Sequence, residues 1–330
     1  AGCNINRSFQ YISKSHPGVF SHSNLTMLIP KEKKQKRPEI RKNNISIFFK
    51  PTEIYYIDDF IWDFCTPDDF KNQHSEFNIN NYVDPYFAEQ EGIRALDFLK
   101  QWYIKENNPI LAIKGSGGIG KTTLVKYFSD TLAKDNKNFR SIFIDTHEIL
   151  NRLKQSFDRN QLDLYDFYEA SSQISHMVTI NENVFRLNID NGNILIIVDG
   201  LDEVISKVDE FNLNNFLKSI HDYSNEIGNG KVLITCRNYF WDKSNPVHNF
   251  ESVELLPFDI NLAKQFFKQN FPNNEKLINK GLKLADNLLR GSHEYIPFVL
   301  DIISYILREE SDNTDFDDPT FITELLNIQI

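Results

Sequence analysis

Residues 115 to 123 have the types and spacing needed to hold a phosphate chain. They form one continuous string, Gly115-Ser116-Gly117-Gly118-Ile119-Gly120-Lys121-Thr122-Thr123. Glycines allow backbone conformations that a side chain would forbid, so several N–H groups can point at the same phosphate. The Lys121 ammonium is expected to reach the β- and γ-phosphates, and the Thr122 hydroxyl is expected to face Mg²⁺. The string therefore predicts a site for ATP or ADP with Mg²⁺.

A second set of candidate residues follows a continuous apolar run. The run from Ile194 to Val198 leads into Asp199, and Gly200-Leu201-Asp202-Glu203 comes next. We expect Asp199 to hold Mg²⁺ through its water shell, together with Thr122. Either Asp202 or Glu203 is expected to be the general base for an attacking water, and the pattern does not choose between them. Three carboxylates this close repel one another unless a cation is present, which argues for a metal ion.

A basic residue ends a further apolar run. Val232 to Thr235 is followed by Cys236 and Arg237. Ligands of a parallel sheet bind beyond the carboxyl ends of its strands, and a guanidinium there can bind phosphate oxygens bidentately. We therefore expect Arg237 to contact the γ-phosphate, with a surface salt bridge as the alternative.

These motifs lie where short apolar runs alternate with amphipathic helices. The expected strands are Ile110 to Ile113, Ser141 to Asp145, Ile194 to Val198, Val232 to Thr235 and Ser252 to Leu256. One expected helix follows the glycine-rich string, and another carries Leu213, Phe216, Leu217 and Ile220 on one face. Such alternation is typical of an α/β fold with a parallel sheet covered by helices on both faces.

The character of the chain changes twice along its length. After Pro257 the strand candidates stop and three helices are expected, with a fourth near Thr320. Before residue 81 the only strand candidates are Ile45 to Phe49 and Tyr55 to Ile57. The predicted organisation is an N-terminal extension or linker over residues 1–80, a nucleotide-binding domain over 81–258 and a small helical domain over 259–330. The first residue is not Met, and the last, Ile330, falls within an amphipathic segment, so we expect a fragment of a longer protein.

Composition and charge argue against other classes of protein. The net charge is −10, and the one basic run, Lys31 to Lys42 with seven Lys or Arg, is interpreted as a solvated linker. A nucleic-acid surface is therefore not indicated. Three separated cysteines predict neither a disulfide framework nor a zinc site, and they suit a reducing cytosol. No apolar run approaches the ~18 residues of a membrane helix. We expect a cytoplasmic protein without membrane contact.

Taken together, the three motifs resemble the NACHT branch of the STAND NTPases, which includes NOD-like receptors and bacterial antiviral proteins. The discriminating string is Asp199-Gly200-Leu201-Asp202-Glu203, a small residue after the first acid and then paired acids. The resemblance implies strand order 5-1-4-3-2. It implies that Pro297 packs on adenine and that backbone at Val83 meets the adenine edge. It also implies an ADP-held closed state, an ATP-bound state that self-associates in the full-length protein, and an unknown trigger ligand. Effectors of the family lie N-terminally, so residues 1–80 could be the tail of one.

Three functions are compatible with these motifs. The first is a regulatory switch in which slow ATP hydrolysis resets a conformational state, a role in bacterial antiviral defence being implied by the resemblance. The second is an ATPase with continuous turnover, of the AAA+ or kinase type, and the third is a scaffold without NTPase activity. The intact Lys121, Thr122, Asp199 and Glu203 count against the scaffold. There is no Asn/Thr-Lys-x-Asp string for guanine and no ABC-transporter signature.

Overall fold

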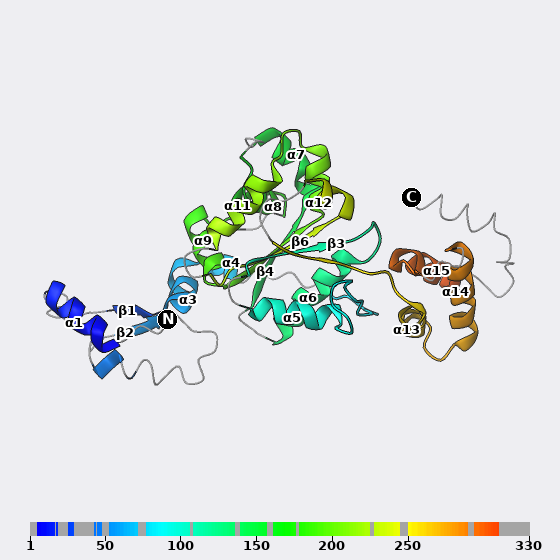
Figure 1. Cartoon of the computed structure of the whole chain (residues 1–330), viewed down its shortest axis with the longest axis horizontal. Coiled ribbons are helices and arrows are strands. Elements are labelled where there is room, and N and C mark those ends of the chain that lie inside the picture. Colours follow the sequence, from blue (N-terminus) through cyan, green and yellow to red (C-terminus); the bar gives the residue numbers. More distant parts are fainter. Residues whose placement is uncertain are drawn as a thin grey trace.

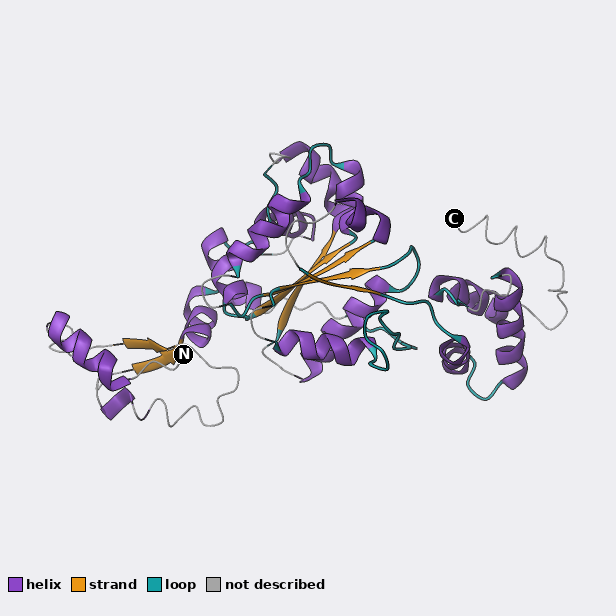
Figure 2. Ribbon diagram, viewed as in Figure 1, coloured by secondary structure: helices purple, strands orange, loops and turns teal. Residues whose placement is uncertain are grey.

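The computed structural model covers most of the chain between residues 53 and 309, with shorter pieces before it (Figure 1, Figure 2). The residues it describes are 5–16, 18, 26–29, 43, 45–47, 53–71, 77–105, 108–135, 139–156, 161–175, 178–224, 228–244, 250–289 and 294–309. The basic run from Lys31 to Lys42 and the helix expected near Thr320 lie outside them. No helix within these ranges combines the length and the apolar character needed to cross a membrane.

Five parallel strands form the central sheet, each where the sequence predicts one. They are β3 (Ile110–Lys114), β4 (Arg140–Asp145), β5 (Ile194–Asp199), β6 (Lys231–Cys236) and β7 (Glu251–Glu254). Their order across the sheet is β4-β5-β6-β3-β7, and all pairs are parallel. Numbered along the chain, this is the predicted order 5-1-4-3-2 read from the other edge. Strand β3 pairs with both β6 and β7, so the loop that follows β3 leaves from the interior of the sheet.

Alternate strand residues pack into two hydrophobic cores on opposite faces of the sheet. One core combines Ile110, Ile196 and Ile234 with the helices between β4 and β7. The other combines Leu111 and Leu195 with α5 (Ala95–Ile104) and α6 (Lys121–Asp135). Figure 1 shows α5 and α6 on one side of the sheet and α7, α8, α11 and α12 on the other. Burial on both faces explains why the strands read as continuous apolar runs rather than as alternating ones.

The connection from β4 to β5 contains three helices that the sequence analysis did not predict. They are α7 (Thr146–Ser156), α8 (Leu164–Ser175) and α9 (Glu182–Asp190). The next connection has α10 (Leu201–Lys207) and the predicted α11 (Leu213–Tyr223), and α12 (Asn238–Ser244) precedes β7. The missed helices nevertheless bury apolar side chains as the predicted ones do, since Leu153, Phe167 and Phe185 are fully buried.

Three further helices form a separate core after the sheet, as predicted. They are α13 (Ile260–Asn270), α14 (Glu275–Leu288) and α15 (Pro297–Glu309). A two-residue bridge joins the segment after β7 to the segment before α15, because the backbone N–H groups of Phe258 and Tyr295 each donate to the other's carbonyl oxygen at 2.9 Å. Val83 belongs to the same core, so the segment before α5 contacts the helical region.

The described N-terminal residues form a small element of their own. Helix α1 (Ile5–Ser15) accompanies the parallel pair β1 (Thr26–Ile29) and β2 (Glu53–Tyr56). Strand β2 contains Tyr55 and Tyr56 but not Ile57, which begins α3 (Ile57–Phe60). The strand expected from Ile45 to Phe49 is wrong for residues 45–47, which are helical.

The chain then approaches the sheet through η2, a π-helix (Ile61–Cys65), and α4 (Asp68–Lys71). The Asn188 side-chain amide donates to Oγ1 of Thr66 at 2.9 Å. Arg140 donates from Nε to the carbonyl oxygen of Lys71 at 2.7 Å. Phe70 is part of the core that α9 and β4 share. Residues 66–71 therefore pack on the sheet unit, by which we mean the five-stranded sheet and the helices on its two faces. They do so although they precede residue 81, where the nucleotide-binding domain was predicted to begin.

Candidate functional site

The glycine-rich string forms the loop between β3 and α6, in the strand–loop–helix context that the motif requires. Gly118 and Gly120 have φ angles of +72° and +100°, which side-chain-bearing residues rarely adopt. A Cβ on Gly115 would lie 2.9 Å from Cγ2 of Ile119. The loop therefore closes too tightly for a side chain at its first position.

The Lys121 ammonium lies against the loop that precedes it. Nζ donates to the carbonyl oxygens of Gly115 at 2.8 Å and Ser116 at 2.9 Å. Burial lowers the pKa of Lys121, while the charges of Asp202 and Asp199 act in the opposite direction. The cation is thus held at the loop, where phosphate oxygens could replace the carbonyl groups as its partners.

Asp199, at the end of β5, lies between two threonine hydroxyls. Its Oδ2 accepts a hydrogen bond from Thr122 at 2.7 Å, and its Oδ1 accepts one from Thr235 at 2.6 Å. Burial raises the pKa of Asp199 above its usual range, although these two hydrogen bonds oppose that shift. The two residues predicted to hold Mg²⁺ are therefore in direct contact. A carboxylate and a hydroxyl oxygen fit this hard cation, which keeps several waters in its remaining positions.

Two threonines that the sequence analysis assigned no role fix the turn after β5. Oγ1 of Thr235 accepts from the N–H of Gly200 at 2.8 Å. Oγ1 of Thr146 lies 2.8 Å from the carbonyl oxygen of Asp199 and 2.6 Å from that of Gly200. Gly200 itself has φ +79°. The sequence contains one indication of this role, namely that Thr146 and Thr235 lie at the ends of the two strands beside β5.

Two of the three acids after β5 are paired with cations of the protein itself, so their repulsion alone does not require a metal ion. Asp202 accepts hydrogen bonds from Arg237, from its Nε at 3.1 Å and its backbone N–H at 3.2 Å. Glu203 forms an ion pair with Lys207 and lies 3.9 Å from Nη2 of Arg237. Within the described ranges no three His, Cys, Asp or Glu side chains converge as metal ligands. Arg237 and Lys207 thus balance the charges of the second and third acids, and a metal ion at Asp199 stays a prediction.

Arg237 leaves β6 at the expected edge of the sheet, and its guanidinium is bound to Asp202. Half of its side chain is exposed, at 53%. Its charge is close enough to Lys121 to lower the pKa of that ammonium. The salt bridge that was the alternative interpretation is thus present, and contact with a γ-phosphate stays a prediction.

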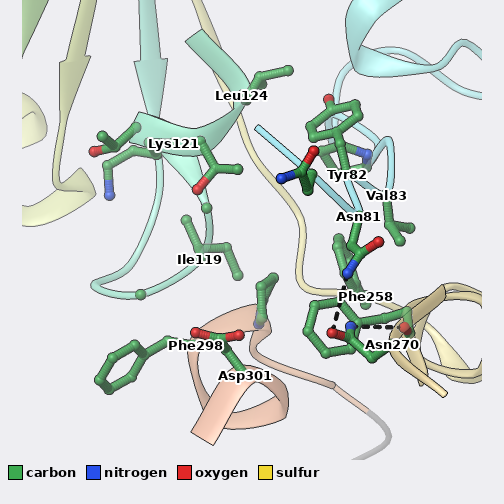
Figure 3. A pocket seen from close by; sticks show the side chains of 18 of the residues that line it. Asn81, Tyr82, Val83, Ile119, Lys121, Leu124, Phe258, Asn270, Phe298 and Asp301 are labelled. Atoms are coloured by element: carbon green, nitrogen blue, oxygen red, sulfur yellow. Dashed lines mark hydrogen bonds between the residues drawn. The ribbon is translucent and has the colours of Figure 1, made fainter. Parts of the chain in front are cut away.

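A cavity of about 500 Å³ lies between the loop and the helical region (Figure 3). Val83 and Pro297, which are far apart in the sequence, both line it, as do residues 118–123. The other predicted site residues are not among its lining residues: Gly115, Ser116, Gly117, Asp199, Asp202, Glu203 and Arg237. The predicted residues therefore fall into two groups, one on the cavity and one at the carboxyl edge of the sheet.

The two ends of the cavity have different linings, and Asn81 and Asn270 lie beside Val83 and Phe258 at one of them (Figure 3). Lys121 lies at the end formed by the loop and α6, whereas Val83 and Phe258 lie at the other end (Figure 3). Several lining residues were not predicted from the sequence, namely Asn80, Asn81, Pro85, Phe258, Phe266, Asn270, Phe298, Asp301 and Arg308. No local sequence pattern marks these residues, because they come from separate segments, the one before α5 and those of the helical region, that meet only in the folded protein.

Few polar contacts join the two sides of the cavity. The backbone N–H of Phe298 donates to the carbonyl oxygen of Gly118 at 3.1 Å. A Cβ on Gly118 would lie 2.9 Å from Cβ of Phe298, so this approach also requires glycine. The Asn81 amide donates to Oδ1 of Asn270 at 3.4 Å. The N-terminal end of α15 is therefore seated directly on the glycine-rich loop.

A comparison with protein families agrees with the motifs. A family model described as the NACHT domain matches residues 109–274, half of the chain. A sequence search of curated proteins found no match. Among solved structures, a chain of the Drosophila ORC bound to DNA is 15% identical, with a TM-score of 0.44; the match covers 71% of this chain and 58% of that one. A Walker-type ATPase of Pyrococcus abyssi is 16% identical, with a TM-score of 0.45, over 71% of this chain and 70% of that one.

Proposed function

The chain belongs to the NACHT domain family of P-loop NTPases, and we propose that it is the ATP-binding, slowly hydrolysing module of a signalling switch. The observation that carries the proposal is the cavity between the glycine-rich loop and α15. A nucleotide there would contact the sheet unit and the helical region together. Whether the nucleotide is ATP or ADP could then determine how the sheet unit and the helical region are held together. The nucleotide would in this way control self-association of the full-length protein. A role in bacterial antiviral defence is part of this proposal and rests on the family resemblance alone. Within this proposal, residues 1–80 are an extension, 81–258 the nucleotide-binding domain and 259–330 the helical domain.

In the proposed complex the phosphates bind the loop N–H groups and Lys121, and the base lies at the end of the cavity that Val83 and Phe258 line. Val83 and Pro297 would contact adenine there, near the Phe258 ring. The lining contains aromatic and proline carbons suited to a flat base. We propose adenine rather than guanine because the chain lacks the guanine-recognition string.

We propose that Thr122 and Asp199 hold Mg²⁺. Their oxygens are 2.7 Å apart, and Asp199 is 7% exposed, so a cation would relieve the burial of its charge. When bound, Mg²⁺ would supply positive charge against the phosphates.

Glu203 is our proposed general base, and Asp202 is proposed to position Arg237. Asp202 is 5% exposed and both its oxygens accept from Arg237. The Glu203 side chain is 24% exposed and can reach water. Lys207 lowers the pKa of Glu203, which makes it a weak base, because proton transfer is most efficient when the pKa lies near the working pH. A weak base favours slow hydrolysis.

Binding and turnover test the proposal together. Isothermal titration calorimetry with Mg²⁺ should show ATP and ADP binding, little binding of GTP, and no measurable binding to Lys121→Ala. Lys134→Ala, at the exposed end of the same helix, is the control and should bind normally. Unchanged affinity in folded Lys121→Ala would remove the site assignment. Steady-state turnover should be well below one per second, against ~10 s⁻¹ for typical enzymes. Rapid turnover by a monomer would favour a continuously working ATPase instead.

A further inference from the structure

One acidic side chain faces the cavity, that of Asp301 on α15. Among the described residues that line the cavity it is the single Asp or Glu. It lies four residues after Pro297, one helical turn further on, so both side chains project from one face of the helix. Figure 3 shows the Asp301 carboxylate opposite Ile119 of the glycine-rich loop. An acid is unexpected next to a loop that binds phosphates, and it calls for a partner that donates hydrogen bonds.

The carboxylate of Asp301 has no such partner within the described part of the chain. It is exposed, and no side chain or backbone group in those ranges forms a hydrogen bond or ion pair with it. The two cations of the cavity are engaged elsewhere. Lys121 donates to the loop carbonyl groups, and Arg308 donates to Oδ1 of Asn270. Asp301 thus presents two acceptor oxygens to whatever fills the cavity.

The position of Asp301 along the cavity identifies the part of a nucleotide that it would meet. Lys121 marks the phosphate end, and Val83 and Phe258 mark the base end (Figure 3). Asp301 and Ile119 lie on opposite walls between these ends. In any nucleotide the sugar connects base and phosphates, so the pentose would lie beside Asp301. A ribose carries two vicinal O–H donors there, and an ionised carboxylate is an acceptor with two oxygens.

We propose that Asp301 accepts hydrogen bonds from the 2′- and 3′-hydroxyl groups of a bound ribonucleotide. The helical region then selects ribonucleotides over deoxyribonucleotides, and it holds the nucleotide by its sugar while the loop holds the phosphates. The proposal rests on the proposed ATP site. Hydrogen bonds to a charged group are the strong ones, so losing them weakens binding by roughly 10- to 100-fold.

Calorimetry with ATP, 2′-deoxy-ATP and 3′-deoxy-ATP tests this proposal. The wild-type protein should bind at least one deoxynucleotide about 10- to 100-fold more weakly than ATP. In Asp301→Ala the affinity for ATP should fall to that for the deoxynucleotide, so that the ratio of the two affinities approaches one. Asp301→Asn retains one acceptor oxygen and should give an intermediate ratio. Glu275→Ala removes an exposed acid of α14 outside the cavity and should keep the wild-type ratio.

The outcomes separate this proposal from the one on which it rests. If neither ATP nor ADP binds the wild-type protein, the ATP site itself is wrong. If ATP binds and both deoxynucleotides bind equally well, the ribose contact is overturned while the ATP site stands. A wild-type preference that survives unchanged in Asp301→Ala also overturns it. Because Asp301 is exposed, the variants should fold, and matching melting curves check that they do.

Discussion

The two sides of the candidate site differ in how firmly they are held. On the sheet side, Asp199 is 7% exposed and each of its carboxylate oxygens accepts a threonine hydroxyl. On the helical side, Phe298 is 47% exposed and meets the loop through a single backbone hydrogen bond. Groups held by several buried hydrogen bonds keep their geometry, whereas an exposed wall with few contacts opens at low free energy. Within the proposed function, we therefore expect chemistry on the sheet side, and recognition of the nucleotide and movement on the helical side.

The largest expected effect comes from the sheet side and concerns rate. Glu203→Gln should slow single-turnover ATP hydrolysis by roughly 10²–10⁴-fold, the range for losing a general base, with ATP affinity within a few-fold of wild type. Asp202→Asn should slow it less and weaken ATP more than ADP, because it loosens Arg237. Rapid-quench assays with calorimetry measure both quantities. If Asp202→Asn slowed hydrolysis more than Glu203→Gln did, Asp202 would be the general base and Glu203 would not.

A smaller effect is expected from the helical side, and it concerns affinity. Pro297→Gly removes ring carbons from the cavity wall and should weaken ATP and ADP alike by about 1–2 kcal/mol, roughly five- to thirtyfold. The single-turnover rate of the bound nucleotide should change less than twofold. Pro272→Gly, in an exposed turn between α13 and α14, is the matched control for backbone flexibility. If Pro297→Gly changed the rate as strongly as the affinity, the division of roles between the two sides would be wrong.

The sheet side could be predicted from sequence because its residues are local to strand ends. Lys121 follows the loop after β3, Asp199 is the last residue of β5 and Arg237 comes directly after β6. The carboxyl ends of parallel strands meet at one edge, so spacing alone brings these residues together. The same reasoning could not tell that Arg237 pairs with Asp202, because strand position fixes where a backbone ends and not which way a long side chain turns.

The helical side could be predicted only through resemblance. Val83 and Pro297 were placed by comparison with a family, and both line the cavity. Asp301 and Phe258 gave no local signal, since their neighbours in space come from other segments. The helices α7, α8 and α9 were missed although each has a buried apolar residue, namely Leu153, Phe167 and Phe185. Tertiary packing on the sheet, rather than sequence period, stabilises such helices.

The smallest effect tests how tightly the sheet side is built, through the stability of the nucleotide-free protein. Burial raises the pKa of Asp199 above the 3.8 of an exposed carboxyl. At a pH between 3.8 and the raised pKa of Asp199 in the folded state, the folded protein binds more protons than the unfolded one. The contribution of Asp199 to the free energy of unfolding therefore falls as pH rises. At neutral pH the ionised carboxylate is therefore destabilising. Asp199→Asn should raise the free energy of unfolding at pH 7 while weakening binding of MgATP.

The gain from Asp199→Asn should shrink as the pH falls through the folded-state pKa of Asp199, because the wild-type carboxyl then becomes neutral as well. Urea unfolding of both proteins between pH 7 and pH ~4.5 follows the difference. Asp209→Asn, at an exposed position after α10, should stay within about 0.5 kcal/mol of wild type at every pH. A loss of stability in Asp199→Asn at pH 7 would mean that the hydroxyls of Thr122 and Thr235 stabilise the charge by more than burial opposes it. The sheet side would then stabilise the ionised Asp199 carboxylate without a metal ion.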